Sequence, residues 1–203
     1  RIGDKFLKAS VGFGGSCFKK DILNLAYLCE TFGLYEIAAY WESIVKMNDY
    51  QRNRFVQTIT KAMFNTITNK RIALFGFAFK ANTSDTRETS ALYVTRKLMM
   101  EKAHVVISDP KAIKNAKNDL KIYGNDIEYQ EDPYKAAKDA HAIAIITEWD
   151  LYKTLDYEKL YRNMKKPAFI FDGRNILDHK KLFKIGFEVH SIGKAPLVHF
   201  KES

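Results

Sequence analysis

The sequence has few cysteines and prolines and lacks any long apolar run. Its 203 residues include 2 cysteines and 4 prolines. No apolar stretch approaches the ~18 residues of a membrane span, and no signal-peptide core stands near the N-terminus. Two cysteines do not make a disulfide framework. We therefore expect a cytoplasmic protein that has no membrane partner.

Two further absences exclude classes of ligand. The five histidines, at positions 104, 141, 179, 190 and 199, show no metal-ligand spacing, so no metal site is expected. The net charge is +9, but the lysines are scattered rather than gathered in a stripe. Such scattering argues against a nucleic acid as partner. Small anionic ligands suit the charge better.

The composition is that of a folded protein with a substantial core. Apolar residues make up 46% of the chain. This length is long for one average domain and short for two, so we expect one large unit with a smaller region attached. Residues 1–69 have only helical periodicity, whereas residues 70–203 alternate between strands and helices.

The first region is expected to hold two helices. Helical spacing of apolar residues predicts a helix from Ser16, its expected cap, to about Phe32, and a second from Tyr35 to about Asn65. The second would be ~45 Å long, more than a small domain needs. We expect it to link domains and to form a dimer, with a plain core helix as the alternative.

The second region is expected to be a doubly wound, Rossmann-like parallel sheet, giving an α/β fold overall. Asp85 with Glu88 suggests a capping box for a helix that runs to about Lys102. Further helices are expected near residues 112–120, 133–140, 157–164 and 179–184. A buried strand that runs into a loop is expected over residues 71–80, and further strands are expected near residues 104–110, 127–129, 141–147, 168–172 and 187–192.

A glycine-rich turn, Gly12-Phe-Gly-Gly15, delivers Cys17 to the start of the first helix. Unpaired N–H groups and the helix dipole there favour an anion, which are conditions for a thiolate nucleophile. Asp21 lies one turn further on the same face, where it can hold a water or accept a proton. Cys29 is better explained as a small buried residue.

Ligands of such a sheet bind at the carboxyl ends of its strands. Phe79 and Lys80 follow the first expected strand and Arg174 follows the fifth, so Lys80 and Arg174 are candidates to bind a phosphate or a sugar hydroxyl. Gly76 stands without the other glycines of the G-x-G-x-x-G fingerprint, which makes a dinucleotide on this sheet a weak inference.

Four motifs lie along the chain: Gly12-Phe-Gly-Gly-Ser-Cys17-Phe-Lys-Lys-Asp21, Phe75-Gly-Phe-Ala-Phe-Lys80, Asp85-Thr-Arg87-Glu88 and Phe171-Asp-Gly-Arg174. Together they closely resemble the UDP-glucose dehydrogenases of the UDP-glucose/GDP-mannose dehydrogenase family. The resemblance covers the whole chain. It implies a central helical region at 1–69 and a C-terminal UDP-binding domain at 70–203, with the NAD-binding N-terminal domain absent.

The resemblance implies NAD-dependent, two-step oxidation of UDP-glucose to UDP-glucuronate. Cys17 would attack the aldehyde-level intermediate to form a thiohemiacetal, and a second hydride transfer would leave a thioester. Water would hydrolyse the thioester with help from Asp21. A covalent thioester divides one difficult reaction into two manageable steps. Because other catalytic groups would lie in the missing domain, we expect the 203-residue chain to be inactive alone.

The resemblance also assigns binding residues. Arg87 would reach the pyrophosphate of NAD, and Arg1 would reach the substrate of a neighbouring subunit, which implies a homo-oligomer, either a dimer or a hexamer. The sugar would be cradled by Lys8, Ala9, Ser10, Val11, Gly12, Phe13 and Gly14, and the UDP portion would be bound by Phe79, Lys80 and Arg174.

Other functions stay open at this point. A related enzyme would oxidise GDP-mannose or a UDP-N-acetylhexosamine with the same cysteine. A non-catalytic nucleotide-sugar binding or oligomerisation module could use the same fold. The chain departs from close relatives at Lys19, Ala81, Asn82 and Ser84, and in a shorter stretch between Asp109 and Asp132. Of these differences, Asn82 and Ser84 lie beside Arg87.

Overall fold

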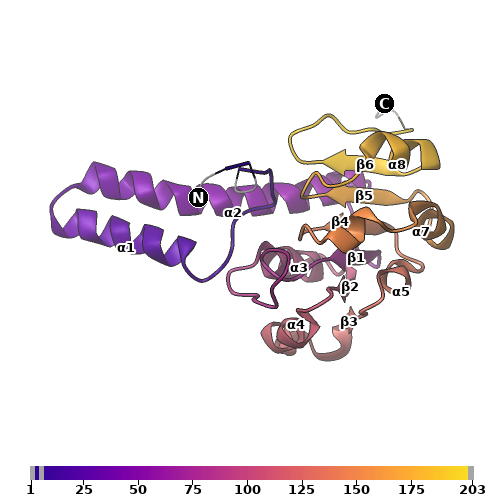
Figure 1. Ribbon diagram of the computed structural model, residues 1–203, viewed down its shortest axis with the longest axis horizontal. Helices are drawn as coiled ribbons and strands as arrows, with labels where there is room; N and C mark the ends of the chain where they lie inside the picture. The colour runs from indigo at the N-terminus through magenta and orange to yellow at the C-terminus, as the bar shows by residue number, and fades with distance from the viewer. Residues whose placement is uncertain (1–2, 5–6, 201–203) are drawn as a thin grey trace.

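A hairpin of two helices extends from a layered α/β unit in the computed structural model of the chain (Figure 1). The structure describes residues 3–4 and 7–200. The hairpin consists of α1 (Phe18–Thr31) and α2 (Tyr35–Ala62), and α2 is a single 28-residue helix as expected. Arg1, expected to contact a neighbouring subunit, lies outside the described residues.

The sheet has six parallel strands in the order β3-β2-β1-β4-β5-β6, which confirms the expected fold class. Strand β1 lies between β2 and β4, with Phe75 opposite both Ser108 and Ile145. The strand order therefore reverses beside β1, where such sheets bind their ligands. The strands are β1 (Arg71–Phe75), β2 (His104–Ser108), β3 (Ile127–Tyr129), β4 (Ala142–Ile145), β5 (Phe169–Asp172) and β6 (Glu188–Ser191).

Helices cover both sides of the sheet (Figure 1), with α3 and α4 on one side and α5 and α7 on the other. This arrangement explains why the central strands β1 and β4 are apolar at every position except Arg71: both faces are buried. The helices of this region are α3 (Ser90–Met100), α4 (Ile113–Asp119), α5 (Pro133–Ala137), α6 (Asp150–Lys153), α7 (Tyr157–Asn163) and α8 (His179–Ile185), and a 3₁₀ helix, η1, spans Lys121–Asp126.

Two expected helix caps are wrong. Helix α1 begins after Cys17 rather than Ser16, and no side chain caps it. Helix α3 is capped by Thr89, whose Oγ1 accepts a hydrogen bond from the Ala91 amide at 3.2 Å. Asp85 makes no capping box, because its carboxylate accepts instead from the backbone and side chain of Arg87.

The C-terminal half of α2 belongs to the same apolar core as the sheet. Phe55, Val56 and Ile59 pack in one cluster with strand residues such as Ile72 and Leu74. A separate, small cluster of Ala26, Cys29 and Ala38 lies between α1 and α2. Cys29 is 8% exposed, which confirms its expected role as a small buried residue.

Within residues 3–4 and 7–200 we find no helix with both the length and the hydropathy of a membrane span. The same part of the chain contains no group of three or more His, Cys, Asp or Glu side chains arranged to hold a metal ion.

Candidate functional site

The turn that precedes α1 lies against two other segments, and its glycines permit the close approach. A Cβ on Gly14 would stand 2.6 Å from the carbonyl oxygen of Glu88. Gly15 has φ +91°, and a Cβ there would stand 3.0 Å from the ring of Phe79. Any other residue would clash or be strained at these positions. The glycines therefore set the turn directly on Glu88 and Phe79.

Cys17 is exposed and immediately precedes the first residue of α1. Its Sγ lies 3.6 Å from the hydroxyl of Ser16. The Asp21 amide donates to the Cys17 carbonyl at 2.8 Å, so Asp21 stands one helical turn away, as expected. The Asp21 side chain is 68% exposed. Both groups can therefore meet a ligand that approaches the start of α1.

Arg87 lies beside the Cys17 turn. The Gly15 amide donates to the Arg87 carbonyl at 2.8 Å, and the Arg87 guanidinium pairs with the Asp85 carboxylate at 2.7 Å. This hydrogen bond raises the pKa of Arg87 and lowers the pKa of Asp85, and the charge of a Cys17 thiolate adds a smaller increase to the pKa of Arg87. An exposed cation thus stands near the thiol.

Two basic residues follow the carboxyl ends of β1 and β5, the two strands on either side of β4. Lys80 Nζ lies 5.4 Å from the centre of the Phe79 ring, just after β1. Arg174, just after β5, pairs with Glu148 at 2.7 Å. The other Glu148 oxygen accepts from the Ala81 amide at 3.3 Å, so Glu148 joins the segments that carry Lys80 and Arg174. Burial lowers the pKa of Arg174, while the charges of Glu148 and Asp172 oppose that shift.

Two buried carboxylates hold these strand-end turns in place. Asp109 Oδ2 accepts from the amides of Phe77 at 2.7 Å and Ala78 at 3.1 Å, and from the indole of Trp149 at 3.1 Å. Asp172 accepts from the amides of Arg174 and Leu177, both at 3.0 Å, and from the His179 ring at 2.9 Å. Both carboxylates are 0% exposed, so they orient backbone rather than face a ligand.

The structure brings most of the expected site residues together. The turn contacts Phe79 through Gly15, and a Cβ on Gly173 would stand 2.4 Å from Val11. The turn therefore packs against the segments that carry Lys80, Arg87 and Arg174. Lys8 and Ala9 are exposed on the irregular segment that leads into it. The Ser10 hydroxyl donates to the Gly12 carbonyl at 2.9 Å.

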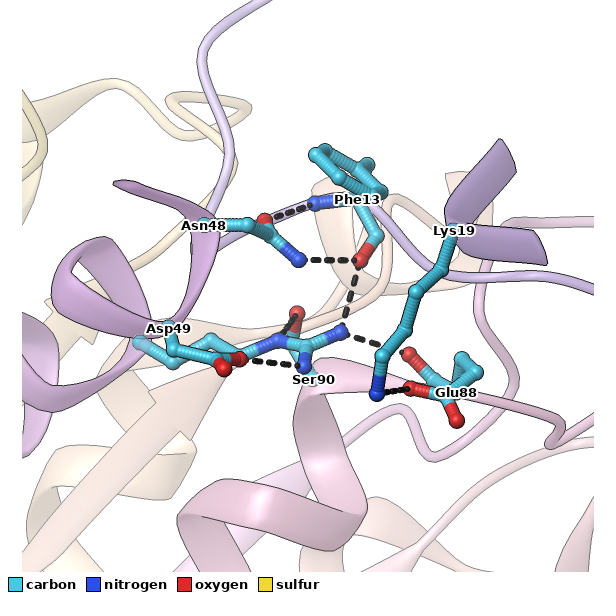
Figure 2. A network of polar contacts seen from close by, with 7 residues as sticks. Phe13, Lys19, Asn48, Asp49, Glu88 and Ser90 are labelled. Atoms are coloured by element: carbon cyan, nitrogen blue, oxygen red, sulfur yellow. Dashed lines mark hydrogen bonds and ion pairs between the residues drawn. The ribbon is translucent and has the colours of Figure 1, made fainter. Parts of the chain in front are cut away.

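Sequence reasoning missed Asn48 and Arg52, two polar residues buried on α2. Asn48 contacts the backbone of Phe13 (Figure 2). Arg52 contacts Phe13, Glu88 and Ser90. One feature of the sequence could have identified them. Asn48 and Arg52 are four residues apart and lie on the same face of α2 as Phe55, Val56 and Ile59. Such a pair on an otherwise apolar face requires buried hydrogen-bond partners.

Two family models match the chain. The model described as the UDP binding domain of the UDP-glucose/GDP-mannose dehydrogenase family matches residues 73–179. The model of the central domain of the same family matches residues 1–50. Between them they include every candidate residue discussed above except Arg52, which lies just beyond the central-domain match.

The chain is also similar to curated proteins that are named UDP-glucose 6-dehydrogenases. UDP-glucose 6-dehydrogenase 4 of Arabidopsis thaliana is 51% identical over 212 residues, which cover 96% of this chain and 44% of the relative. UDP-glucose 6-dehydrogenase of Mus musculus is 53% identical over 205 residues, which cover 96% of this chain and 42% of the relative. The chain thus spans less than half the length of these relatives.

A solved structure has the same arrangement of elements. A UDP-glucose dehydrogenase from the hyperthermophilic archaeon Pyrobaculum islandicum matches with a TM-score of 0.75 and 29% identity, over 92% of this chain and 40% of that one. An NDP-N-acetyl-D-galactosaminuronic acid dehydrogenase from Methanosarcina mazei also has a TM-score of 0.75, at 19% identity, which shows the fold alone.

Proposed function

Because the chain belongs to the UDP-glucose/GDP-mannose dehydrogenase family, we propose that it is the cysteine-bearing and UDP-binding part of an NAD-dependent UDP-glucose 6-dehydrogenase. The complete protein would oxidise UDP-glucose to UDP-glucuronate. One observation carries the proposal: the turn that presents Cys17 contacts the Phe79 ring, next to Lys80 at the carboxyl end of β1. A nucleotide at this sheet edge would have its sugar near the thiol.

Residues 1–69 would form the central region and residues 70–203 the UDP-binding domain. In the latter, Phe79 would pack on the nucleotide while Lys80 and Arg174 neutralise its diphosphate. Arg174 suits this role because Glu148 already holds its guanidinium at 2.7 Å. A planar guanidinium donates to a phosphate in a bidentate manner, and little side-chain freedom is left to lose.

In the chemical step, the Cys17 sulfur would form a bond to the aldehyde carbon at C6, and the proton lost by the thiol would pass to the carbonyl oxygen. Loss of a hydride and that proton would give a thioester on Cys17. Water, deprotonated with the help of Asp21, would then add to the acyl carbon. The C–S bond would then break to release the carboxylate; one proton of the water would pass to the Cys17 sulfur, which restores the thiol, and the other would pass to solvent.

The residues present fit a limited contact with NAD. Arg87 suits the pyrophosphate because its guanidinium is 68% exposed and close to the Cys17 turn. The turn after β1 does not suit a dinucleotide, because Gly76 packs against Thr147, only 2.3 Å from where a Cβ would stand. NAD, when bound, would supply the acceptor for both hydrides. Residues outside this chain would have to provide most of its site.

The nucleophile can be tested by alkylation with iodoacetamide as a function of pH. We expect Cys17 to react faster at neutral pH than a free cysteine, because it is exposed at the start of α1 and close to Arg87. Cys17→Ser should abolish the fast reaction, and Cys29→Ser should leave it unchanged. A reaction no faster than that of a free cysteine would favour the non-catalytic binding module.

Nucleotide specificity can be tested by calorimetric titration of the chain with UDP, GDP and UDP-glucose. We expect UDP compounds to bind best. Arg174→Met and Lys80→Met should each weaken binding roughly tenfold to a hundredfold, the effect of losing one charged hydrogen bond. Lys194→Met is the control. Tighter binding of GDP would instead favour a GDP-sugar dehydrogenase.

A further inference from the structure

The Arg52 side chain lies buried where three segments far apart in the sequence meet: α2 itself, the glycine turn and residues 88–90. It comes from the middle of α2 and is 5% exposed. Its partners converge from the glycine turn, from the loop before α3 and from the first residue of α3, as Phe13, Glu88 and Ser90 show in Figure 2. A charged side chain is rarely buried unless its N–H groups are satisfied, and here most are.

One nitrogen of Arg52 joins the turn to the loop. Nη2 donates to the carbonyl oxygens of Phe13 and Glu88, each at 2.7 Å. Nε donates to the Ser90 hydroxyl at 3.2 Å, and Nη1 pairs with Asp49 at 3.2 Å. Because the guanidinium is planar and rigid, these bonds set the two carbonyls in one geometry. A lysine ammonium could not make all of them.

Asn48, one turn earlier on α2, holds the turn at a second point. Its Oδ1 accepts from the Phe13 amide at 2.9 Å, and its Nδ2 donates to the Phe13 carbonyl at 3.1 Å. Both backbone groups of Phe13 are therefore bonded to α2. On its other side the turn is bonded to the loop, through the Gly15 amide and the Arg87 carbonyl.

Glu88 adds a third connection. Its φ is +52°, a left-handed conformation that is unfavourable for a glutamate and persists only where neighbours impose it. Its carbonyl accepts from Arg52, and its carboxylate pairs with Lys19 at 3.0 Å. Lys19 stands two residues after Cys17, in the first turn of α1. The strained residue therefore ties α1 to α2.

We propose that Arg52, together with Asn48, is a positioning residue that keeps the Cys17 turn and the Arg87 segment in register. The proposal rests on the proposed function, in which Cys17 is the nucleophile and Arg87 meets the cofactor. Neither Arg52 nor Asn48 bonds to those side chains, so both act through the backbone of Phe13 and Glu88. Their removal would let the thiol and the cation move independently.

Hydrogen exchange of assigned amides in the 203-residue chain separates positioning from a general structural role. In Arg52→Lys and Asn48→Ala we expect the Phe13 and Gly15 amides to exchange about tenfold faster or more, because both report opening of the turn. The Ala73 and Ile143 amides in the central strands should be unchanged. Arg54→Lys, an exposed arginine on the same helix, is the matched control.

Chemical rescue gives a second readout. In Arg52→Ala, millimolar guanidinium ion should restore slow exchange at Gly15 and the wild-type pH profile of Cys17 alkylation. In Asn48→Ala, guanidinium ion should restore neither the slow exchange at Gly15 nor the pH profile of alkylation. Exchange that stays slow at Phe13 and Gly15 in every folded variant would overturn the proposal. Faster exchange that is spread equally over the turn and the strands would also overturn the proposal, because it would report a loss of global stability.

The two proposals fail in different ways. A wild-type Cys17 that alkylates like a free thiol would overturn the assigned nucleophile, and exchange would still decide whether Arg52 holds the turn. Suppose instead that wild-type Cys17 reacts faster than a free thiol and that the pH profile of its alkylation is the same in Arg52→Lys and Asn48→Ala. That result would overturn only the proposal that Arg52 and Asn48 are positioning residues.

Discussion

At the scale of single residues, Asp172 links the stability of the sheet edge to pH. Burial would raise its pKa, but hydrogen bonds from His179, Leu177 and Arg174 outweigh burial and hold the pKa below its ordinary value. Because the folded pKa is the lower one, the carboxylate stabilises the fold above the pKa of the unfolded chain. This stabilisation is lost as the pH falls through the folded pKa.

Asp172→Asn should therefore lower the thermal midpoint more at pH 7 than near pH 3. At pH 7 we expect a loss of about 1.5–3 kcal/mol, the value of a charged hydrogen bond. Thermal unfolding followed by circular dichroism at several pH values would measure it. Asp126→Asn, at an exposed aspartate, should show little effect throughout. An Asp172→Asn effect that did not change with pH would contradict this account.

Gly14 is a second residue whose replacement has a defined cost. In Gly14→Ala the new Cβ would meet the Glu88 carbonyl at 2.6 Å, and that carbonyl is already held by Arg52. We expect a loss of about 1–3 kcal/mol, typical of overpacking. Urea unfolding would measure it. Gly3→Ala, with no atom within 4 Å of its Cβ, should be neutral; equal losses for both would argue against the contact.

At the scale of elements, the α1–α2 hairpin exposes large apolar side chains over a small core. Tyr27 and Tyr40 are each 63% exposed and Phe32 is 78% exposed, whereas the core between the helices consists mainly of Ala26, Cys29 and Ala38. Exposed apolar surface of this kind marks an interaction site. It supports the proposal that the long helix contributes to a homo-oligomer.

Sedimentation velocity over a range of concentrations tests this proposal. We expect the wild-type chain to self-associate and the double variant Tyr27→Glu with Tyr40→Glu to remain monomeric, because two charges would have to be desolvated at the interface. Ile122→Glu is the control, since Ile122 is 73% exposed on η1, away from the hairpin. Equal dissociation by the control, or a monomeric wild type, would count against the hairpin.

At the scale of the whole molecule, α2 serves both the hairpin and the sheet. Its residues Phe55, Val56 and Ile59, followed by Met63 and Ile67, share the core of the sheet. The division between residues 69 and 70 remains a prediction, and these contacts suggest how to test it. Removal of α2 would expose the apolar surface that those residues cover.

We expect a fragment of residues 70–203 to be much less stable in urea than one of residues 50–203. Each of the five lost side chains contributes about 1.5–3 kcal/mol by burial, and the total is comparable to the stability of a whole domain. Circular dichroism would compare the fragments. Equal unfolding midpoints would show that the sheet folds independently of α2.

Much of the fold follows from patterns that are local in the sequence. The six strands and the long helix were predictable because apolar periodicity reports local structure and burial. The location of Lys80 and Arg174 at one sheet edge followed from parallel strand direction. The cap at Asp85 was wrong because a competing partner decides a cap: Arg87 binds the Asp85 carboxylate, and Thr89 caps α3 instead. The cap at Ser16 was wrong because α1 begins after Cys17, one residue later than expected.

The sequence by itself determined the elements, their order and the exposed cysteine at a helix start. Only the tertiary structure decided what holds that cysteine in place. Arg52 binds the carbonyls of Phe13 and Glu88, 39 and 36 residues away from it. Backbone carbonyls are the same in every residue, so no sequence pattern marks them as partners. Their role arises only when folding brings three distant segments around one buried guanidinium.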